Sequence, residues 1–586
     1  MRSRAGTVEE ITPAEANVRT LVHEYGGASW WVADGVLFWV DFADQRLRRT
    51  AGAQTTVLTP EPPTPRGLRY ADGVVTADGA TVVCVRERHG DGAEPVNELV
   101  AIATDGSEAA TVLWQGSDFV SSPRLSPDGA MLAFISWDHP AMPWTRTRLH
   151  VYAVDGASLG AELLVLGGER AFCEPGWDTA GSDTAGSDTG RLLVVVDDDE
   201  WWNLYAVDIG SGALEPVVSG RFEIAMPPWV FGMKRWAVVD GTIVAVAGLP
   251  TGDELIVDGR TSTTIDSSIN SLSAAGSSVV ATGAGYDHEV EVVSIDVADG
   301  VPRRHIVRPA KPLDYDRGYL VEPEWISFPT GPSGEAVAHA LYYPPANPRH
   351  VGPADEKPPL LVLAHGGPTT QARRRLQTSL LYWTSRGIAV VDVDYRGSSG
   401  YGRTYRQALD GQWGVSDVED CVAAASFLAD RGDVDPDRLM IRGGSAGGFT
   451  VLSALAFHDV FAVGASRYGV ADLEALATDT HKFESRYLDS LVGPYPDAKA
   501  IYHQRSPIHH VDRLRAPMIV LQGDDDAIVP PNQSEMIVDA LEANGVEVEY
   551  RLFEGEQHGF RKAENIVTAL EAELAFFGRI LGFTPA

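Results

Sequence analysis

Two patterns of hydrophobic and polar positions divide the chain. From about residue 18 to residue 315, short runs of alternating apolar and polar residues are separated by polar turns, many of them Asp-Gly. This alternation is typical of strands that are buried on one face. From about residue 321 onward, longer apolar runs alternate with segments of helical periodicity. That pattern predicts buried parallel strands separated by helices.

The turns of the first half recur at a regular interval. Asp105, Asp155, Asp208 and Asp258 each follow a strand-like run, and successive aspartates are 50, 53 and 50 positions apart. A repeat of this length, with several strands in each unit, is typical of β-propeller blades. About 300 residues at this spacing give six or seven blades, and we expect about seven. A β-sandwich array is the alternative, and the regular spacing favours the propeller.

The second half contains apolar runs of strand length that end in loops rich in glycine or aspartate. These runs occupy residues 360–364, 388–394, 439–441 and 518–521. Strands that alternate with helices predict a doubly wound parallel sheet, in which reactive groups gather at the carboxyl ends of the strands. We therefore expect two domains, a β-propeller in residues 1–317 and an α/β-hydrolase-type domain in residues 318–586.

One of these runs ends in a serine that stands between glycines. The segment Gly443-Gly-Ser-Ala-Gly447 follows an apolar strand and precedes a helical pattern of small residues. Gly-x-Ser-x-Gly between a strand and a helix is the nucleophile elbow, a strained turn that exposes the serine hydroxyl above a sheet. The sequence therefore predicts that Ser445 is a nucleophile.

A serine hydroxyl needs a general base, and the base needs a carboxylate that orients it. In hydrolases of this class the three residues follow in the order Ser, Asp, His. His558 is the one histidine in the sequence beyond the run at residues 518–530, so chain order selects it as the base. Asp524, Asp525 and Asp526 follow that run directly, and position alone leaves the choice among them open.

Acyl transfer also requires hydrogen-bond donors for the oxyanion. The backbone N–H of Ala446, directly after the nucleophile, is expected to be one donor. The second is expected from the His365-Gly-Gly-Pro368 loop after the first long apolar strand. Gly367 is the favoured donor there, because the lack of a side chain lets its backbone approach the substrate.

Charge and composition limit the classes of molecule that the protein is expected to bind. The net charge is −34, and a polyanion of this size is expected to bind neither nucleic acid nor an anionic membrane. Three cysteines argue against a disulfide framework, and the sequence has no hydrophobic signal core and no membrane-length apolar run. These features predict a cytoplasmic protein. No zinc-type spacing of Cys or His is present, so we expect no metal and no cofactor.

The combined motifs resemble the prolyl oligopeptidase family of serine peptidases, with the acylaminoacyl-peptidase and aminopeptidase group as the branch they are most similar to. The matching stretches are His365-Gly-Gly-Pro368, Tyr395-Arg-Gly-Ser-Ser-Gly-Tyr-Gly402, Gly443-Gly-Ser-Ala-Gly-Gly448, Ser506-Pro507, Gly523-x-x-Asp526-x-x-Val529-Pro530 and His558-Gly559. Among the three aspartates, the family pattern implies Asp526 as the orienting acid. It also implies a propeller that covers the active site, and therefore short peptides or small amides as substrates.

The sequence specifies the residues that bind the substrate amine less clearly than it specifies the catalytic residues. An exopeptidase that takes a free amine needs a carboxylate near the first substrate residue, whereas an acylaminoacyl-peptide hydrolase needs an apolar surface there. Glu24, Asp138 and Glu200 lie in segments that combine aromatic residues with carboxylates, and we predict that they bind the amine. Aromatic packing between blades, with the acidic side chains in solvent, is the alternative interpretation of these segments.

A second segment is predicted to form the wall of the side-chain pocket. Residues 480–487 follow the nucleophile helix and its next strand, and they include Phe483, Glu484 and Tyr487. The two aromatic residues favour an apolar or aromatic substrate side chain. A surface helix with ion pairs is the alternative interpretation of this segment.

From these features we expect a serine peptidase that acts through an acyl-enzyme on Ser445, and an aminopeptidase that releases N-terminal residues is the favoured activity. The alternatives are an acylaminoacyl-peptide hydrolase, a small-molecule amidase or esterase of the same fold, and a non-catalytic propeller interaction protein. The expected partner is a short peptide or small amide. The sequence is compatible with a monomer and with a homo-oligomer.

Overall fold

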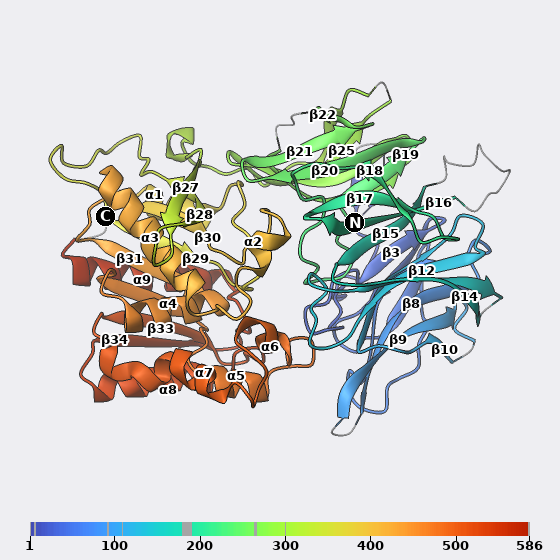
Figure 1. Ribbon diagram of the computed structural model, residues 1–586. Coiled ribbons are helices and arrows are strands. Elements are labelled where there is room, and N and C mark those ends of the chain that lie inside the picture. The colour runs from blue at the N-terminus through green and yellow to red at the C-terminus, as the bar shows by residue number, and fades with distance from the viewer. Residues whose placement is uncertain are drawn as a thin grey trace.

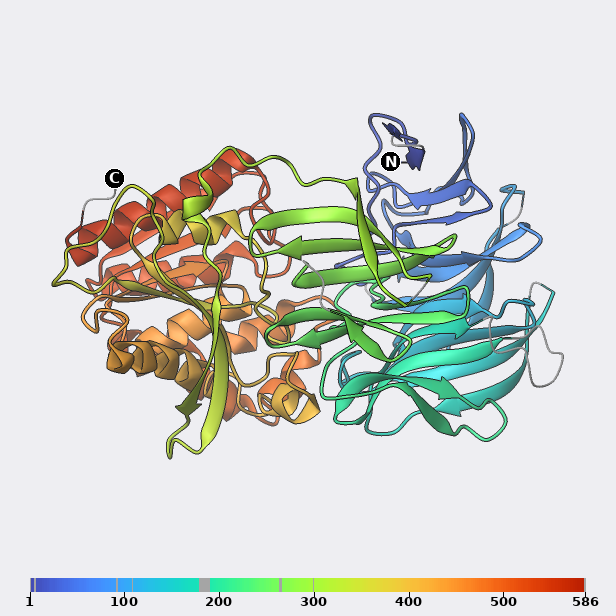
Figure 2. The same ribbon diagram turned by 90° about the horizontal axis from the view of Figure 1, so that it is seen from above.

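A computed structural model describes the chain except residues 1, 5, 6, 91, 92, 108, 157, 179–189, 263–265, 299 and 584–586. It shows two parts side by side, a ring of β-sheets and a layered α/β domain (Figure 1). Seen from above, the N-terminus lies on the β-sheet side and the C-terminus on the α/β side (Figure 2). None of the described helices combines the length and the apolarity that a membrane crossing requires.

The first part consists of six four-stranded antiparallel sheets, and each sheet pairs its strands in chain order. The strands of the six blades are β3 (Trp30–Ala33), β4 (Val36–Val40), β5 (Leu47–Ala51) and β6 (Gln54–Val57); β7 (Leu68–Val75), β8 (Thr81–Gly90), β9 (Ala93–Ala103) and β10 (Thr111–Trp114); β11 (Phe119–Leu125), β12 (Met131–Trp137), β13 (Arg148–Asp155) and β14 (Ser158–Leu166); β15 (Phe172–Asp178), β16 (Arg191–Asp199), β17 (Trp201–Val207) and β18 (Leu214–Val218); β19 (Trp236–Val239), β20 (Thr242–Leu249), β21 (Gly252–Val257) and β22 (Arg260–Ser262); β23 (Ser268–Ala275), β24 (Ser278–Gly285), β25 (His288–Asp296) and β26 (Arg303–Arg308). Two short strands, β1 (Arg2–Arg4) and β2 (Thr7–Glu9), pair with each other outside the blades.

The prediction of a β-propeller is confirmed, but the prediction of about seven blades is wrong, because the described residues form six. The four periodic aspartates lie at the end of the third strand of four consecutive blades or within two residues after it, which explains their spacing. The error arises at the two ends of this region. Residues 10–29 and 309–323 contribute no strand to a blade, so fewer residues than assumed are distributed over the repeat.

The second part is built on one eight-stranded sheet in the order β27-β28-β30-β29-β31-β32-β33-β34. An antiparallel pair leads into a parallel sheet, as the sequence predicts. The strands are β27 (Glu324–Thr330), β28 (Ala336–Tyr343), β29 (Leu360–Ala364), β30 (Ala389–Asp394), β31 (Leu439–Gly444), β32 (Val463–Arg467), β33 (Met518–Gly523) and β34 (Val548–Phe553).

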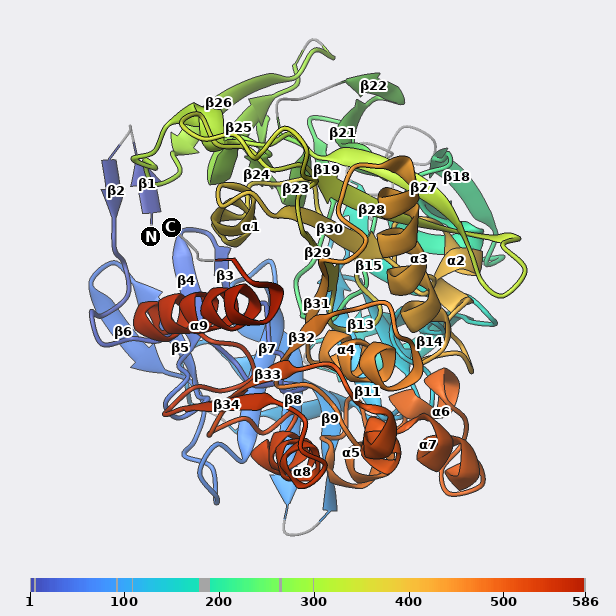
Figure 3. The same ribbon diagram turned by 90° about the vertical axis from the view of Figure 1, so that its left-hand side faces the viewer.

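Helices cover both faces of this sheet. The helices are α1 (Thr378–Thr384), α2 (Arg403–Gln407), α3 (Ser416–Arg431), α4 (Ala446–Phe457), α5 (Leu473–Asp479), α6 (Tyr487–Leu491), α7 (Lys499–Arg505), α8 (Pro531–Ala543) and α9 (Ala563–Leu581). Helices α3, α4 and α8 share one apolar core with one face, whereas α1 and α9 share a second core with the other (Figure 3). Alternate residues of each parallel strand therefore point into different cores, as in a doubly wound sheet.

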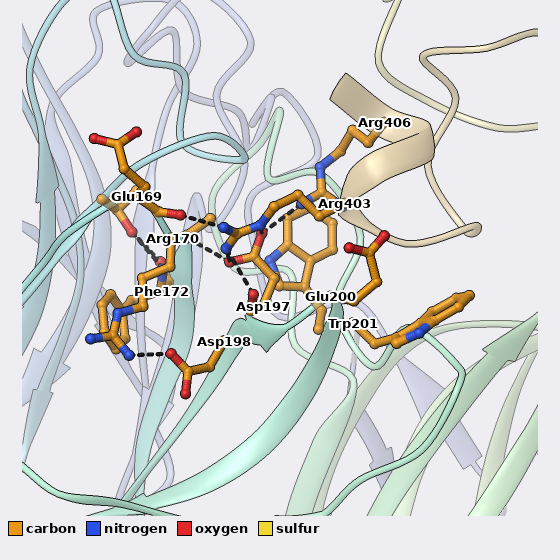
Figure 4. Close-up of polar contacts among 12 residues, drawn as sticks. Glu169, Arg170, Phe172, Asp197, Asp198, Glu200, Trp201, Arg403 and Arg406 are labelled. Carbon is orange, nitrogen blue, oxygen red and sulfur yellow. Dashed lines mark hydrogen bonds and ion pairs between the residues drawn. The ribbon is translucent and has the colours of Figure 1, made fainter. Parts of the chain in front are cut away.

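A buried ion cluster joins the two parts (Figure 4). Asp197, at the end of β16, accepts hydrogen bonds from the guanidinium groups of Arg403 (3.0 Å) and Arg406 (2.7 Å), both on α2. Glu223 contacts Arg406 at 3.5 Å and accepts the backbone N–H of Gly402. Two carboxylates thus neutralise two guanidinium groups across the interface, which fixes α2 against the propeller.

Candidate active site

Ser445 lies in the turn between β31 and α4 with a left-handed backbone (φ 57°, ψ −123°). A non-glycine residue adopts this conformation at a cost, and such strain is typical of functional turns. The neighbouring glycines are required by close packing. A Cβ on Gly443 would lie 2.3 Å from the Gly447 carbonyl oxygen, and one on Gly447 would lie 2.1 Å from that of Ala364. The backbone approach of helix and strand therefore holds the serine at the carboxyl end of β31.

His558 and Asp526 form a hydrogen-bonded pair beside this turn. The Nδ1 atom of His558 lies 2.8 Å from Oδ2 of Asp526. The other oxygen of Asp526 accepts the backbone N–H groups of Ile528 and Val529, both at 2.9 Å, and the side chain is completely buried. These bonds fix the direction of the carboxylate relative to the imidazole. Among the three candidate aspartates, Asp526 is the one that contacts His558, whereas Asp524 accepts the backbone N–H of Gly555.

The loop after β29 is held rigidly next to the serine. The imidazole of His365 lies 2.8 Å from the Ser398 hydroxyl, and the Tyr395 hydroxyl donates to the His365 carbonyl oxygen at 2.9 Å. Burial lowers the pKa of His365 to about 4, so its ring is neutral at physiological pH. Gly367 has φ +116°, a conformation that favours glycine. The loop thereby presents its backbone to the site, as an oxyanion donor would require.

Two cavities of different character meet at Ser445. The smaller one contains Ser445, Ala446 and Gly367, and its remaining wall is largely apolar. That wall consists of Pro368, Trp413, Val470, Leu476, Thr480, Glu484, Tyr487, Leu488, Leu491, Ile528 and Val529. The larger cavity, of about 530 Å³, contains Ser445 and His558 and is more polar. A substrate bond at Ser445 therefore has an apolar pocket on one side and an open polar space on the His558 side.

A carboxylate lies at the boundary between the two cavities. Glu484 is part of the wall of the apolar cavity, and its Oε1 accepts a hydrogen bond of 2.6 Å from the hydroxyl of Tyr25. Tyr25 comes from the propeller and borders the polar cavity. Burial and the nearby Glu484 raise the pKa of Tyr25 well above its usual value, so the hydroxyl stays protonated and acts as a donor. The imidazole of His481 lies 3.9 Å from the second oxygen of Glu484.

Of the three residues predicted to form the wall of the side-chain pocket, Glu484 and Tyr487 border the apolar cavity. Tyr487 borders the apolar cavity, and its hydroxyl lies 2.6 Å from that of Thr369. Phe483 borders neither cavity, so the structure gives no support to its predicted role in the pocket. Its ring instead packs among aromatic side chains of the propeller, including His23, Phe119 and Trp229. It anchors the segment to the propeller and leaves the adjacent Glu484 facing the site.

The three acidic residues predicted from the propeller lie outside both cavities, and each has another partner. Glu24 pairs with Arg69 at 2.6 Å. Asp138 pairs with Arg148. Glu200 accepts hydrogen bonds from the backbone N–H and hydroxyl of Thr404, so it belongs to the interface beside α2. The structure does not bring these carboxylates to the two cavities at Ser445, and it therefore gives no support to their predicted role as the amine site.

The carboxylates of Glu24 and Glu87 and the ring of His89 lie within mutual reach of one cation. The guanidinium of Arg69, however, contacts Glu24 at 2.6 Å and Glu87 at 3.2 Å, and it supplies the positive charge there. This cluster therefore gives no support to a metal site.

Several residues of the site were not predicted from the sequence. Tyr25 adjoins the predicted Glu24 and is the residue of that segment that enters the site. Trp413 borders the apolar cavity, and Tyr468 packs on His558 with ring centroids 4.8 Å apart. Neither residue belongs to a motif that can be recognised in the sequence. Arg442 and Arg467 face the polar cavity from the ends of two parallel strands. A charged residue in an otherwise apolar strand was the available signal for these two.

Comparisons with known proteins agree with this geometry. A family model described as the prolyl oligopeptidase family matches residues 374–584. A solved Mycobacterium tuberculosis structure, a puromycin-hydrolyzing peptidase, is 39% identical, with a TM-score of 0.93, and the match covers 99% of this chain and 90% of that one. Among curated relatives, dipeptidyl aminopeptidase BIII of Pseudoxanthomonas mexicana is 30% identical over 45% of this chain and 40% of its own length. The acylamino-acid-releasing enzyme of Arabidopsis thaliana is 31% identical over 37% of this chain and 29% of its own length.

The chain thus spans less than half the length of these two curated relatives but nearly the whole of the solved structure. Because that structure is similar over both the propeller and the α/β part, the likeness is not confined to one domain. The chain belongs to the prolyl oligopeptidase family of serine peptidases.

Proposed function

We propose that this protein is a serine aminopeptidase that releases the N-terminal residue of short peptides or small amides through an acyl-enzyme on Ser445. The observation that carries the proposal is the position of Glu484. This carboxylate borders an otherwise mainly apolar cavity that also contains Ser445 and Gly367. A substrate whose first side chain fills that cavity would place its free amine beside the carboxylate.

The catalytic steps follow from the arrangement of the site. His558, oriented by Asp526, accepts the Ser445 proton as the hydroxyl attacks the substrate carbonyl. The backbone N–H groups of Gly367 and Ala446 stabilise the oxyanion. His558 then protonates the leaving amine, and water repeats the cycle to release the free amino acid.

The surroundings of Glu484 favour a free amine over an acylated one. An ammonium group would form a charge-assisted hydrogen bond with Glu484, while Tyr25 holds the carboxylate in place. An N-acyl group would instead bury this carboxylate against apolar atoms without a compensating charge, which is costly. The remaining wall, with Trp413, Leu488 and Leu491, suits a large apolar or aromatic side chain.

A small-molecule amidase is the second candidate, and the solved relative that hydrolyses puromycin favours it. Puromycin joins an aromatic amino acid with a free amine to a nucleoside through an amide bond. The same amine site and apolar cavity would accept its aminoacyl part, so both candidates share one recognition step. The acylaminoacyl-peptide hydrolase is the competing activity.

Replacement of Glu484 tests the proposal. Glu484→Gln should lower kcat/KM for a phenylalanine anilide with a free amine about 10–150-fold, the factor expected when a charged hydrogen bond is lost. The matched control is Glu474→Gln, since Glu474 also accepts a tyrosine hydroxyl, that of Tyr495, but lies on the surface. Wild-type hydrolysis of the N-acetylated anilide at a rate equal to that of the free amine would contradict the assignment.

A further inference from the structure

Two arginines form the floor of the polar cavity. Arg442 on β31 and Arg467 on the adjacent strand β32 both point to the face of the sheet that α9 covers, where they share Glu573. Arg467 binds this carboxylate through two bonds of 2.7 and 2.6 Å, and Nε of Arg442 lies 3.1 Å from each oxygen. Both arginines also border the cavity that contains Ser445 and His558.

In this cluster two guanidinium groups share one ion-paired carboxylate. Among the described residues, Glu573 is the one carboxylate that forms an ion pair with either arginine. The remaining nitrogens, Nη1 and Nη2 of Arg442 and Nη1 of Arg467, have no protein acceptor in the described part of the chain. Asp392 of β30 faces the same cavity without an ion pair to them. Guanidinium groups with free N–H donors are well suited to bind a carboxylate.

The cavity lies on the side of Ser445 where the leaving group departs. It contains His558, which protonates the leaving amine, whereas the apolar cavity holds the acyl part. The Ser445 N–H donates to the Arg467 carbonyl oxygen at 3.0 Å, so the two backbones are adjacent. Arg442 lies three positions before Ser445, which is about 10 Å of strand. An extended peptide spans about 3.3–3.6 Å per residue, so a leaving group of one or two residues reaches these arginines.

We propose that Arg442 and Arg467 bind the C-terminal carboxylate of the leaving peptide. This inference rests on the proposed aminopeptidase function and narrows its substrate class to di- and tripeptides with both termini free. The amine at Glu484 and the carboxylate at the arginine pair would then define the two ends of the substrate. Longer peptides would have to bury their additional residues beyond the arginines.

The experiment compares Phe-Ala-Ala with its C-terminal amide, with cleavage of the Phe–Ala bond followed by mass spectrometry. The wild-type enzyme should show a kcat/KM for the free acid about tenfold or more above that for the amide, mainly through KM, because a charge-assisted bond is lost in the amide. In Arg442→Gln the acid-to-amide ratio should fall toward one, and Arg442→Lys should restore part of it.

A charge-matched control separates this role from a structural one. Arg438 precedes β31, pairs with Asp435 at 2.6 Å and lies outside the polar cavity, so Arg438→Gln should keep the wild-type ratio. Arg467→Gln serves as the second variant if Arg442→Gln does not fold, since it should lower the same ratio.

Three outcomes would overturn the inference. A wild-type ratio near one, with both peptides cleaved, would contradict it and leave the aminopeptidase function intact. An unchanged ratio in Arg442→Gln or Arg467→Gln would show that the arginines serve only to attach α9. Cleavage of neither peptide by the wild type would refute the proposed function, and the inference with it.

Discussion

Two clusters of buried charges in this molecule use arginine and carboxylate side chains in different proportions. At the interface between the two parts, Arg403 and Arg406 face Asp197 and Glu223, and the charges balance. Below Ser445, Arg442 and Arg467 share Glu573 alone. The first cluster is enclosed by protein on both sides, whereas the second borders a cavity of about 530 Å³.

The difference in charge balance matches a difference in role. A balanced buried cluster has little residual attraction for a ligand, and breaking one partner leaves an uncompensated charge. A cluster in which two guanidinium groups share one ion-paired carboxylate beside a cavity keeps donors available for an anion. We therefore interpret the interface cluster as a fixed attachment between the two parts and the cluster below Ser445 as part of a binding site. The predictions below test this distinction.

The largest expected effect comes from the nucleophile and belongs to neither cluster. Ser445→Ala should lower kcat by about 10⁴–10⁶-fold, because loss of the nucleophile removes the covalent pathway. Thermal unfolding should change little, since both clusters remain intact. The inactive variant also allows binding to be measured alone by calorimetry, and free-acid tripeptides should bind more tightly than their amides. Near-normal turnover would refute the role of Ser445.

The next effect concerns the stability of the interface cluster. Asp197→Asn leaves Arg403 and Arg406 without their shared charge, and it should reduce the free energy of unfolding by about 3–5 kcal/mol. The control is Asp198→Asn, since Asp198 forms a partly exposed ion pair with Arg170 and should cost about 0–1 kcal/mol. Chemical denaturation of both variants measures the difference. Equal losses would mean that burial does not distinguish these two pairs.

The sequence determines the chemistry of the α/β part well, because each group there follows a strand end. Ser445, His558 and the loop at Gly367 are specified by local motifs and by chain order, and the parallel sheet brings them to one edge. The choice of Asp526 over its two neighbours depends on the direction of one loop. That direction is set by backbone bonds to Ile528 and Val529, which local residue types do not reveal.

The propeller residues that contribute to the substrate site could not be predicted from local motifs and chain order. Glu24, Asp138 and Glu200 resemble amine ligands in sequence, but each partner comes from elsewhere in the fold, such as Arg69 and Thr404. In the wall segment, the sequence could not tell which of Phe483 and Glu484 faces the site. That orientation is decided by aromatic packing against the propeller, including His23 and Trp229. The number of blades likewise depended on where the repeat begins and ends.

The smallest expected effect comes from Asp392, which faces the polar cavity close to the cluster below Ser445. Burial raises the pKa of Asp392 to about 6, with Arg442 opposing the shift. Above about pH 6 its carboxylate is ionised and offsets the positive charge that Glu573 leaves uncompensated, whereas below that pH it is neutral. The charged or titratable groups around it include Arg442, Arg467, Glu573, His558, Asp394, Tyr343 and Cys421.

The acid-to-amide ratio of kcat/KM should therefore rise about two- to fivefold as pH falls from 8 to 5.5, because a neutral Asp392 no longer repels the substrate carboxylate. Any effect of pH on the shared catalytic steps acts on both substrates equally and cancels in the ratio. Asp392→Asn should give a flat ratio over this range, whereas Asp525→Asn, outside the cavity, should keep the wild-type slope. A ratio that falls with decreasing pH would contradict the assignment, because protonation of Asp392 increases the net positive charge beside the two arginines.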